Sequence, residues 1–135
     1  IALVRGVIKE NEATINMPIA RSTKDRKKMA VSKDGKEAIT HFKVIKRYDK
    51  YTLIEVKIET GRTHQIRVHM SQIGYPIVGD VVYSNGKNPF GVVGQMLHSS
   101  KLTFKHPITN KEINLEAPLP EYFVEVLNKL DNINA

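Results

Sequence analysis

Cysteine is absent from the 135-residue sequence, so neither a disulfide bond nor a zinc site built on thiolates can form. The sequence also lacks any apolar run near the roughly 18 residues that a membrane-spanning helix requires, and no secretory signal opens it. These absences are typical of a protein of the reducing cytoplasm, and we expect a cytoplasmic location. The hydrophobic content of 41% and the charged content of 26% are those of a globular domain.

Motifs of several enzyme classes are missing too. There is no Gly-x-Ser-x-Gly turn of the kind that carries a hydrolase nucleophile, and no glycine-rich loop that would hold a nucleotide phosphate. His64 and His69 are five residues apart, about 140° around a helix, so they do not share a face as paired metal ligands would. We therefore expect no metal site.

Positive charge is concentrated near the start of the chain. The net charge is +7, and residues 1–50 hold thirteen Lys and Arg against six Asp and Glu, whereas the remainder is balanced. Such a segment favours a polyanion, most often a nucleic acid. No aromatic side chain lies among the charges of residues 19–36, so phosphate contact is favoured over base stacking. The alternative is a solvated face; the candidate binding residues are Arg21, Lys24, Arg26, Lys27, Lys28 and Lys33.

The apolar patterning predicts an α+β domain that is mainly antiparallel or mixed β-sheet, with little free sheet face. Helices are expected over residues 63–73 and 120–130, followed by a frayed tail. No repeat or linker divides the chain, so residues 1–135 are taken as one domain. The predicted strands cover residues 2–8, 13–17, 29–31, 38–48, 51–58, 96–104 and 112–116.

The chain is organised around residues 59–70, where a strand gives way to the first helix. Thr63 is the expected N-cap, and Ile66, Met70 and Ile73 share the face expected to be buried. Cations crowd the helix start, although that end already carries partial positive charge. This arrangement is stable if a carboxylate or phosphate lies among them; the alternative is an arginine that is solvated or paired with a surface acid.

Several strings in this region and beyond resemble the RluA/RluC/RluD family of RNA pseudouridine synthases. Their order and spacing match that family from residue 1 to about residue 123. The strings are Gly61-Arg62-Thr63-His64-Gln65-Ile66-Arg67-Val68-His69-Met70, Gly74-Tyr75-Pro76-Ile77-Val78-Gly79-Asp80 with Tyr83, Met96 to Pro107, and Ala117-Pro118-Leu119-Pro120.

The resemblance implies part of a pseudouridine synthase catalytic domain. Such an enzyme is an isomerase without a cofactor that detaches uracil from its ribose in RNA, rotates it and rejoins it through C5. The family uses an aspartate in a His-Arg-Leu-Asp block, a tyrosine and an arginine, and only the arginine maps here, onto Arg67. Its implied role is to pair with the aspartate and hold it ionised. The supporting positions are Arg62, His64, Gln65 and Leu102.

No His-Arg-Leu-Asp string occurs in the sequence, and the family tyrosine would fall just before Ile1. We therefore expect a C-terminal portion of the catalytic domain that is inactive alone, with Arg67 lacking its acidic partner and an exposed edge on the first strand that favours self-association. The RNA is expected to be large-subunit ribosomal RNA, with transfer RNA possible. The competing functions are a non-catalytic RNA-binding module and a structural protein of the ribosome.

Overall fold

The computed structural model describes residues 1–25, 27–84, 95–99 and 101–134, and the side chains of these except 101–105 and 132–134. Its main sheet has four strands in the order β1 (Ala2–Arg5), β6 (Tyr51–Ile58), β5 (Ile39–Arg47) and β2 (Glu12–Asn16). Two hairpins pair β3 (Ile19–Arg21) with β4 (Met29–Val31), and β7 (Lys101–Lys105) with β8 (Glu112–Glu116). The helices are α1 (Gln65–Gln72) and α2 (Glu121–Asn134).

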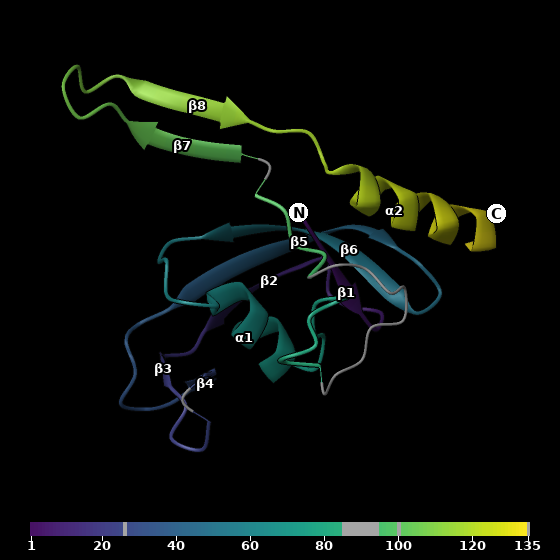
Figure 1. Ribbon diagram of the computed structural model, residues 1–135, viewed down its shortest axis with the longest axis horizontal. Coiled ribbons are helices and arrows are strands. Elements are labelled where there is room, and N and C mark those ends of the chain that lie inside the picture. The colour runs from purple at the N-terminus through teal and green to yellow at the C-terminus, as the bar shows by residue number, and fades with distance from the viewer. Residues whose placement is uncertain (26, 85–94, 100, 135) are drawn as a thin grey trace.

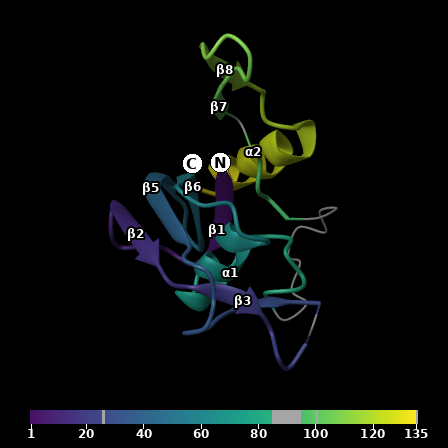
Figure 2. The ribbon, with the colours of Figure 1, turned by 90° about the vertical axis from the view of Figure 1, so that its left-hand side faces the viewer.

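Every strand pairing among the described residues is antiparallel, and with two helices the predicted α+β class is confirmed. The two helices lie on opposite faces of the main sheet (Figures 1 and 2). The neighbouring residues Leu53 and Ile54 in β6 point to opposite faces and are both buried. The middle of the sheet is therefore covered on both sides, as predicted. This cover ends near the strand termini, where Ile45 and Ile58 are about half exposed.

The outer edge of β1 is bonded rather than bare. The Leu3 amide donates to the carbonyl of Met96 at 3.0 Å, and the Val78 amide donates to the Leu3 carbonyl at 2.9 Å. The Arg5 amide donates to the carbonyl of Pro76 at 2.9 Å. The expectation of an exposed edge on the first strand is wrong, because two later segments supply its hydrogen bonds. Self-association stays a prediction without that edge to support it.

The β3–β4 hairpin confirms the short strand predicted at residues 29–31. Its base packs beside α1, where Ile19 and Val68 are buried together with Ala38. Gly35 lies so close to this base that a Cβ on it would meet backbone atoms of Ile19 at 2.5–2.7 Å. The hairpin is thus anchored at its base, while its basic loop extends away from the sheet (Figure 2).

Both helices depart from the sequence prediction at their ends. The N-cap of α1 is His64 and not Thr63, and its side chain makes no capping hydrogen bond. The buried residues of α1 are Gln65, Val68, His69 and Met70, so Met70 confirms the predicted face, whereas Ile66 and Ile73 are only partly buried. The second helix continues to Asn134 instead of fraying. Neither helix of the described chain is long and apolar enough to cross a bilayer.

Candidate functional site

The turn that leads into α1 is held against β5 by one buried amide. Gln65 Nε2 donates to the Ile39 carbonyl and to Thr40 Oγ1, both at 2.9 Å. Gln65 Oε1 accepts from Thr60 Oγ1 at 2.7 Å and from the Arg62 amide at 3.1 Å. A single side chain therefore satisfies polar groups of both the strand and the turn, which fixes the position where α1 begins.

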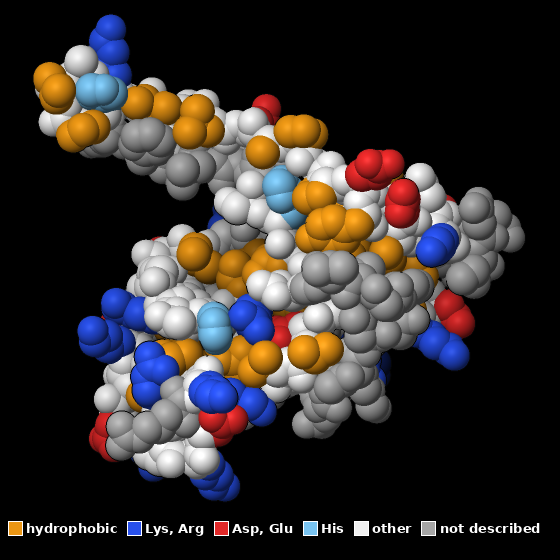
Figure 3. All heavy atoms as spheres, in the orientation of Figure 1, with side chains coloured by type: hydrophobic (Ala, Val, Ile, Leu, Met, Phe, Trp, Pro, Cys, Tyr) orange, Lys and Arg blue, Asp and Glu red, His pale blue; other side chains and the backbone are white. Residues whose placement is uncertain are grey.

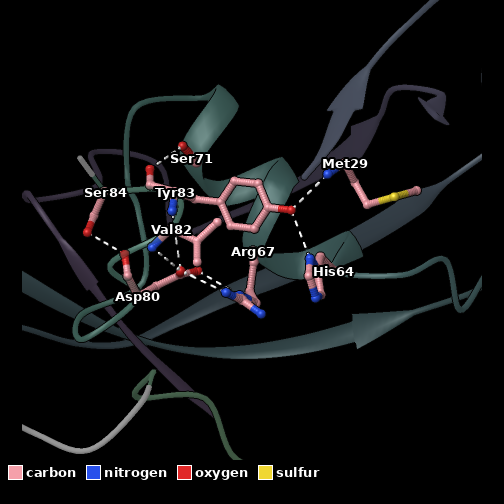
Figure 4. Close-up of polar contacts among 8 residues, drawn as sticks. All are labelled: Met29, His64, Arg67, Ser71, Asp80, Val82, Tyr83 and Ser84. Carbon is pink, nitrogen blue, oxygen red and sulfur yellow. Dashed lines mark hydrogen bonds and ion pairs between the residues drawn. The ribbon is translucent and has the colours of Figure 1, made fainter. Parts of the chain in front are cut away.

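His64 occupies an unusual backbone conformation at that position. Its φ of 55° and ψ of 22° lie in the left-handed region. This conformation costs a residue with a Cβ roughly 1–3 kcal/mol, so it persists only where surrounding contacts hold it. The ring Nδ1 lies 2.8 Å from the hydroxyl oxygen of Tyr83, and the two rings meet edge-on at 79°. Tyr83 thus holds the His64 side chain in place (Figure 4).

Arg67 projects from α1 into a paired contact with Asp80. Its Nε donates to Asp80 Oδ2 at 2.8 Å and its Nη2 donates to Oδ1 at 2.9 Å. This is the two-pronged geometry in which arginine binds a carboxylate most strongly. The guanidinium carbon also lies 5.1 Å from the centre of the Tyr83 ring, within cation–π range. The expectation that Arg67 lacks an acidic partner in this chain is therefore wrong, because Asp80 supplies one.

Asp80 is a structural acid rather than a reacting one. Its side chain is 0% exposed, and Oδ1 also accepts from the amides of Val82 at 3.2 Å and Tyr83 at 3.3 Å. A carboxylate so enclosed cannot reach a substrate. The Arg67 side chain retains 13% exposure, and within the described part of the chain its Nη1 makes no hydrogen bond. The guanidinium can therefore bind a second acceptor on its open side.

The surroundings set opposite protonation tendencies for these two side chains. The hydrogen bonds that Arg67 donates to Asp80 raise the pKa of Arg67, despite the opposing effect of burial. Burial, and next the positive charge of Arg67, lower the pKa of His64; Asp80 opposes them, and Arg21 adds a smaller lowering effect. Arg67 is thus a fixed cation at neutral pH, and His64 is held neutral beside it.

His69 has a different role from His64. It is completely buried, with Nδ1 accepting from Thr40 Oγ1 at 2.8 Å and Nε2 donating to the Met17 carbonyl at 2.9 Å. Both ring nitrogens are used inside the fold, so this side chain joins α1 to β5 and to the end of β2 rather than facing a ligand.

The remaining predicted site residues are dispersed. Arg62 Nε donates to the Glu37 carbonyl at 2.8 Å, so this arginine braces the turn. Among the described residues, no hydrogen bond joins Arg62 to the Asp80 carboxylate. Leu102 lies in β7 opposite Leu115, and its side chain falls outside the described residues. A Cβ on Gly61 would meet no atom within 4 Å, so nothing nearby requires glycine there.

The predicted RNA-binding residues are on or beside the β3–β4 hairpin. Arg21, Lys24, Lys27 and Lys33 are exposed and Lys28 is partly buried, whereas Arg26 lies outside the described residues. Figure 3 shows Lys and Arg side chains gathered over this part of the molecule. The Tyr83 side chain contacts the Met29 amide in β4, His64 and the Arg67 guanidinium, which ties this hairpin to the start of α1. The hairpin and the Arg67 site are therefore neighbours.

Sequence reasoning missed Asp80 and Tyr83 as parts of the site. Both belong to a string that resembles the family, but that resemblance assigned neither residue a role in the site. The available signal was the order of residues 77–80, in which an acid follows two apolar residues and a glycine; the two apolar residues, Ile77 and Val78, are buried. A carboxylate in such apolar surroundings needs a cation as its partner.

Comparison with known proteins gives one consistent family. A family model described as RNA pseudouridylate synthase matches residues 1–72. An uncharacterized RNA pseudouridine synthase of Bacillus subtilis, YlyB, is 48% identical over 129 residues, which are 96% of this chain and 42% of that protein. Ribosomal large subunit pseudouridine synthase D of Pseudomonas aeruginosa is 44% identical over 141 residues, covering 96% of this chain and 44% of that protein.

Solved structures agree with this family at the level of the fold. The structure of human RNA pseudouridylate synthase domain containing 1 matches with a TM-score of 0.75 at 27% identity, covering 96% of this chain and 63% of that one. The chain spans about two fifths of the length of the curated relatives that it matches.

Proposed function

The chain belongs to the RNA pseudouridylate synthase family, and from this premise we propose that the protein of which it forms a part isomerises uridine to pseudouridine in large-subunit ribosomal RNA. The carrying observation is that the Arg67 guanidinium is clamped by a buried acid on one side and open on the other. Support for the substrate class comes from relatives named as ribosomal large subunit pseudouridine synthase D. We place the reaction in the cytoplasm.

In this proposal Arg67 holds the catalytic carboxylate on its open side. That carboxylate comes from the part of the protein outside these 135 residues, as does the catalytic tyrosine. A cation at hydrogen-bond distance keeps such an acid ionised in a dry pocket, and a planar fork also fixes its direction. Asp80 supports this role because it fixes the guanidinium from behind. Gln65 and Arg62 fix the turn from which α1 starts, and Leu102 is proposed to line the uracil pocket.

The basic hairpin is proposed to bind the RNA backbone. Its charges contribute sequence-independent affinity through released counterions, whereas no aromatic side chain of the loop offers a stacking surface. Because Tyr83 contacts both Met29 in β4 and the Arg67 guanidinium, RNA bound along β3–β4 would pass the start of α1.

The isomerisation breaks the bond from N1 to the ribose, forms a bond from C5 to the same carbon, releases the C5 proton and protonates N1. Large-subunit RNA that carries tritium at C5 of uridine and lacks the modification therefore reports each turnover as tritiated water. We expect release by the whole protein. RNA binding without release would instead support a non-catalytic RNA-binding module, and release from transfer RNA alone would contradict the proposed substrate class.

A further inference from the structure

Tyr83 is the residue through which the basic hairpin, the start of α1 and Arg67 are joined. Its hydroxyl oxygen lies 3.0 Å from the main-chain nitrogen of Met29 in β4 and 2.8 Å from Nδ1 of His64. Its ring lies against the Arg67 guanidinium, and its main chain bonds to Ser71 and Asp80. Figure 4 shows these hydrogen bonds converging on Tyr83.

The two hydroxyl contacts can be assigned a direction. A main-chain N–H only donates, so the Tyr83 oxygen accepts from Met29. The hydroxyl proton is then donated to the remaining partner, Nδ1 of His64. An imidazole that accepts at Nδ1 and is neutral carries its proton on Nε2. No described residue bonds to that Nε2, and Figure 4 shows it directed away from Tyr83.

We propose that Tyr83 is a positioning residue that locks His64 as a neutral donor, with the Nε2 proton aimed at a phosphate oxygen of the RNA backbone. This inference rests on RNA being the substrate. The neutral state is favoured because burial and the positive charge of Arg67 lower the pKa of His64 by more than the negative charge of Asp80 raises it, and Arg21 adds a smaller lowering effect. A neutral donor close to cationic side chains is suited to an anionic acceptor, which the cations attract and the donor orients.

The left-handed conformation of His64 belongs to the same device. With ordinary helical φ and ψ the ring would leave the start of α1 in another direction, so the bond to Tyr83 and the strained backbone specify each other. A device that only capped the helix would use the side chain on an amide of the first turn, and His64 makes no such bond.

The first test is spectroscopic and needs no RNA. In the whole protein, long-range ¹H–¹⁵N spectra of the imidazoles at neutral pH should show His64 protonated at Nε2 and not at Nδ1. Tyr83→Phe removes only the hydroxyl and should give a mixture of tautomers. Tyr75→Phe is the matched control, because the Tyr75 hydroxyl makes no hydrogen bond among the described residues, and it should leave the spectrum as in the parent. A parent ring protonated at Nδ1, or a Tyr83→Phe spectrum like the parent's, would overturn the inference.

The second test measures RNA affinity and the single-turnover rate of the whole protein. Tyr83→Phe and His64→Ala should each lower affinity or rate roughly three- to tenfold, the effect of one hydrogen bond, without changing the salt slope, because no cation is lost. His64→Asn should retain part of the effect, since asparagine tolerates the left-handed region and keeps an N–H donor. If the protein binds RNA but does not isomerise uridine, the proposed function fails while the affinities still decide the role of His64. Affinity and rate like the parent's in both Tyr83→Phe and His64→Ala would refute the proposed role of His64.

Discussion

Removing the charge of Asp80 should destabilise the fold more than the loss of any exposed ion pair. Asp80→Asn keeps the shape of the side chain, and its Oδ1 can still accept from the amides of Val82 and Tyr83. The substitution removes the negative charge that balances Arg67, and it places an NH₂ group, which can only donate, against the N–H donors of the guanidinium. Breaking a buried pair in this way costs about 3–5 kcal/mol. Because the Arg67 side chain is 13% exposed, we take the lower end, about 3 kcal/mol of unfolding free energy.

The assay is equilibrium urea unfolding of four proteins: the parent, Asp80→Asn, Arg67→Met and the double variant. Unchanged m-values would license the comparison of midpoints. The double variant should be less destabilised than the sum of the single variants by about 2 kcal/mol, because the second change relieves an unbalanced charge. A matched cycle on the exposed pair Lys46 and Asp131 should show a much smaller coupling. If the Arg67–Asp80 coupling falls below about 0.5 kcal/mol, Asp80 does not anchor the guanidinium and our account of the site is wrong.

Other perturbations test the remaining parts of the argument. Arg67→Lys in the whole protein should slow the single-turnover step by about 30-fold to several thousand-fold, which corresponds to roughly 2–5 kcal/mol. Arg62→Lys should slow it less, because Arg62 bonds to a main-chain carbonyl. Equal rates for Arg67→Lys and the parent would show that Arg67 takes no part in catalysis. Gly35→Ala should destabilise the protein by about 1–3 kcal/mol because its Cβ would collide with the Ile19 backbone, while Gly61→Ala should not; similar thermal midpoints for both would contradict this. Replacing Lys27, Lys28 and Lys33 together by glutamine should lower the slope of log RNA affinity against log salt by up to about three units. An unchanged slope would assign these lysines to a solvated face.

Most strands and both helices were predictable because their signals are local, whereas β3 was not predicted and the strand expected from residue 96 begins at Lys101. Apolar and β-branched runs mark β5 and β6, and the spacing of Phe123, Val126, Leu127 and Leu130 marks the inner face of α2. Phe123, Val126 and Leu130 are at most 4% exposed, and Leu127 is partly buried against the core. The N-cap of α1 was not predictable, because propensity favours Thr63 and the choice of His64 is made by a hydrogen bond from Tyr83, 19 residues away. Tertiary contacts of this kind override local preference.

The site was predictable only in part for the same reason. Arg67 could be singled out from its place in a motif, but its partner could not, because the direction of the Asp80 carboxylate depends on the backbone just before it. Gly79 has a φ of 81° there, a conformation that turns the chain back toward α1. No pattern along the sequence states that the acid 13 residues beyond Arg67 returns to meet it.

The bonded outer edge of β1 has a consequence for the order in which the chain acquires its structure. The β5–β6 hairpin needs only its own tight turn and can form early. β1 instead waits for β6 on one side, and for residues 78 and 96 on the other. Closing such long loops is slow and entropically costly. While the polypeptide emerges from a ribosome, β1 can pair with β6, but its outer edge cannot complete its hydrogen bonds until residue 96 has left the exit tunnel.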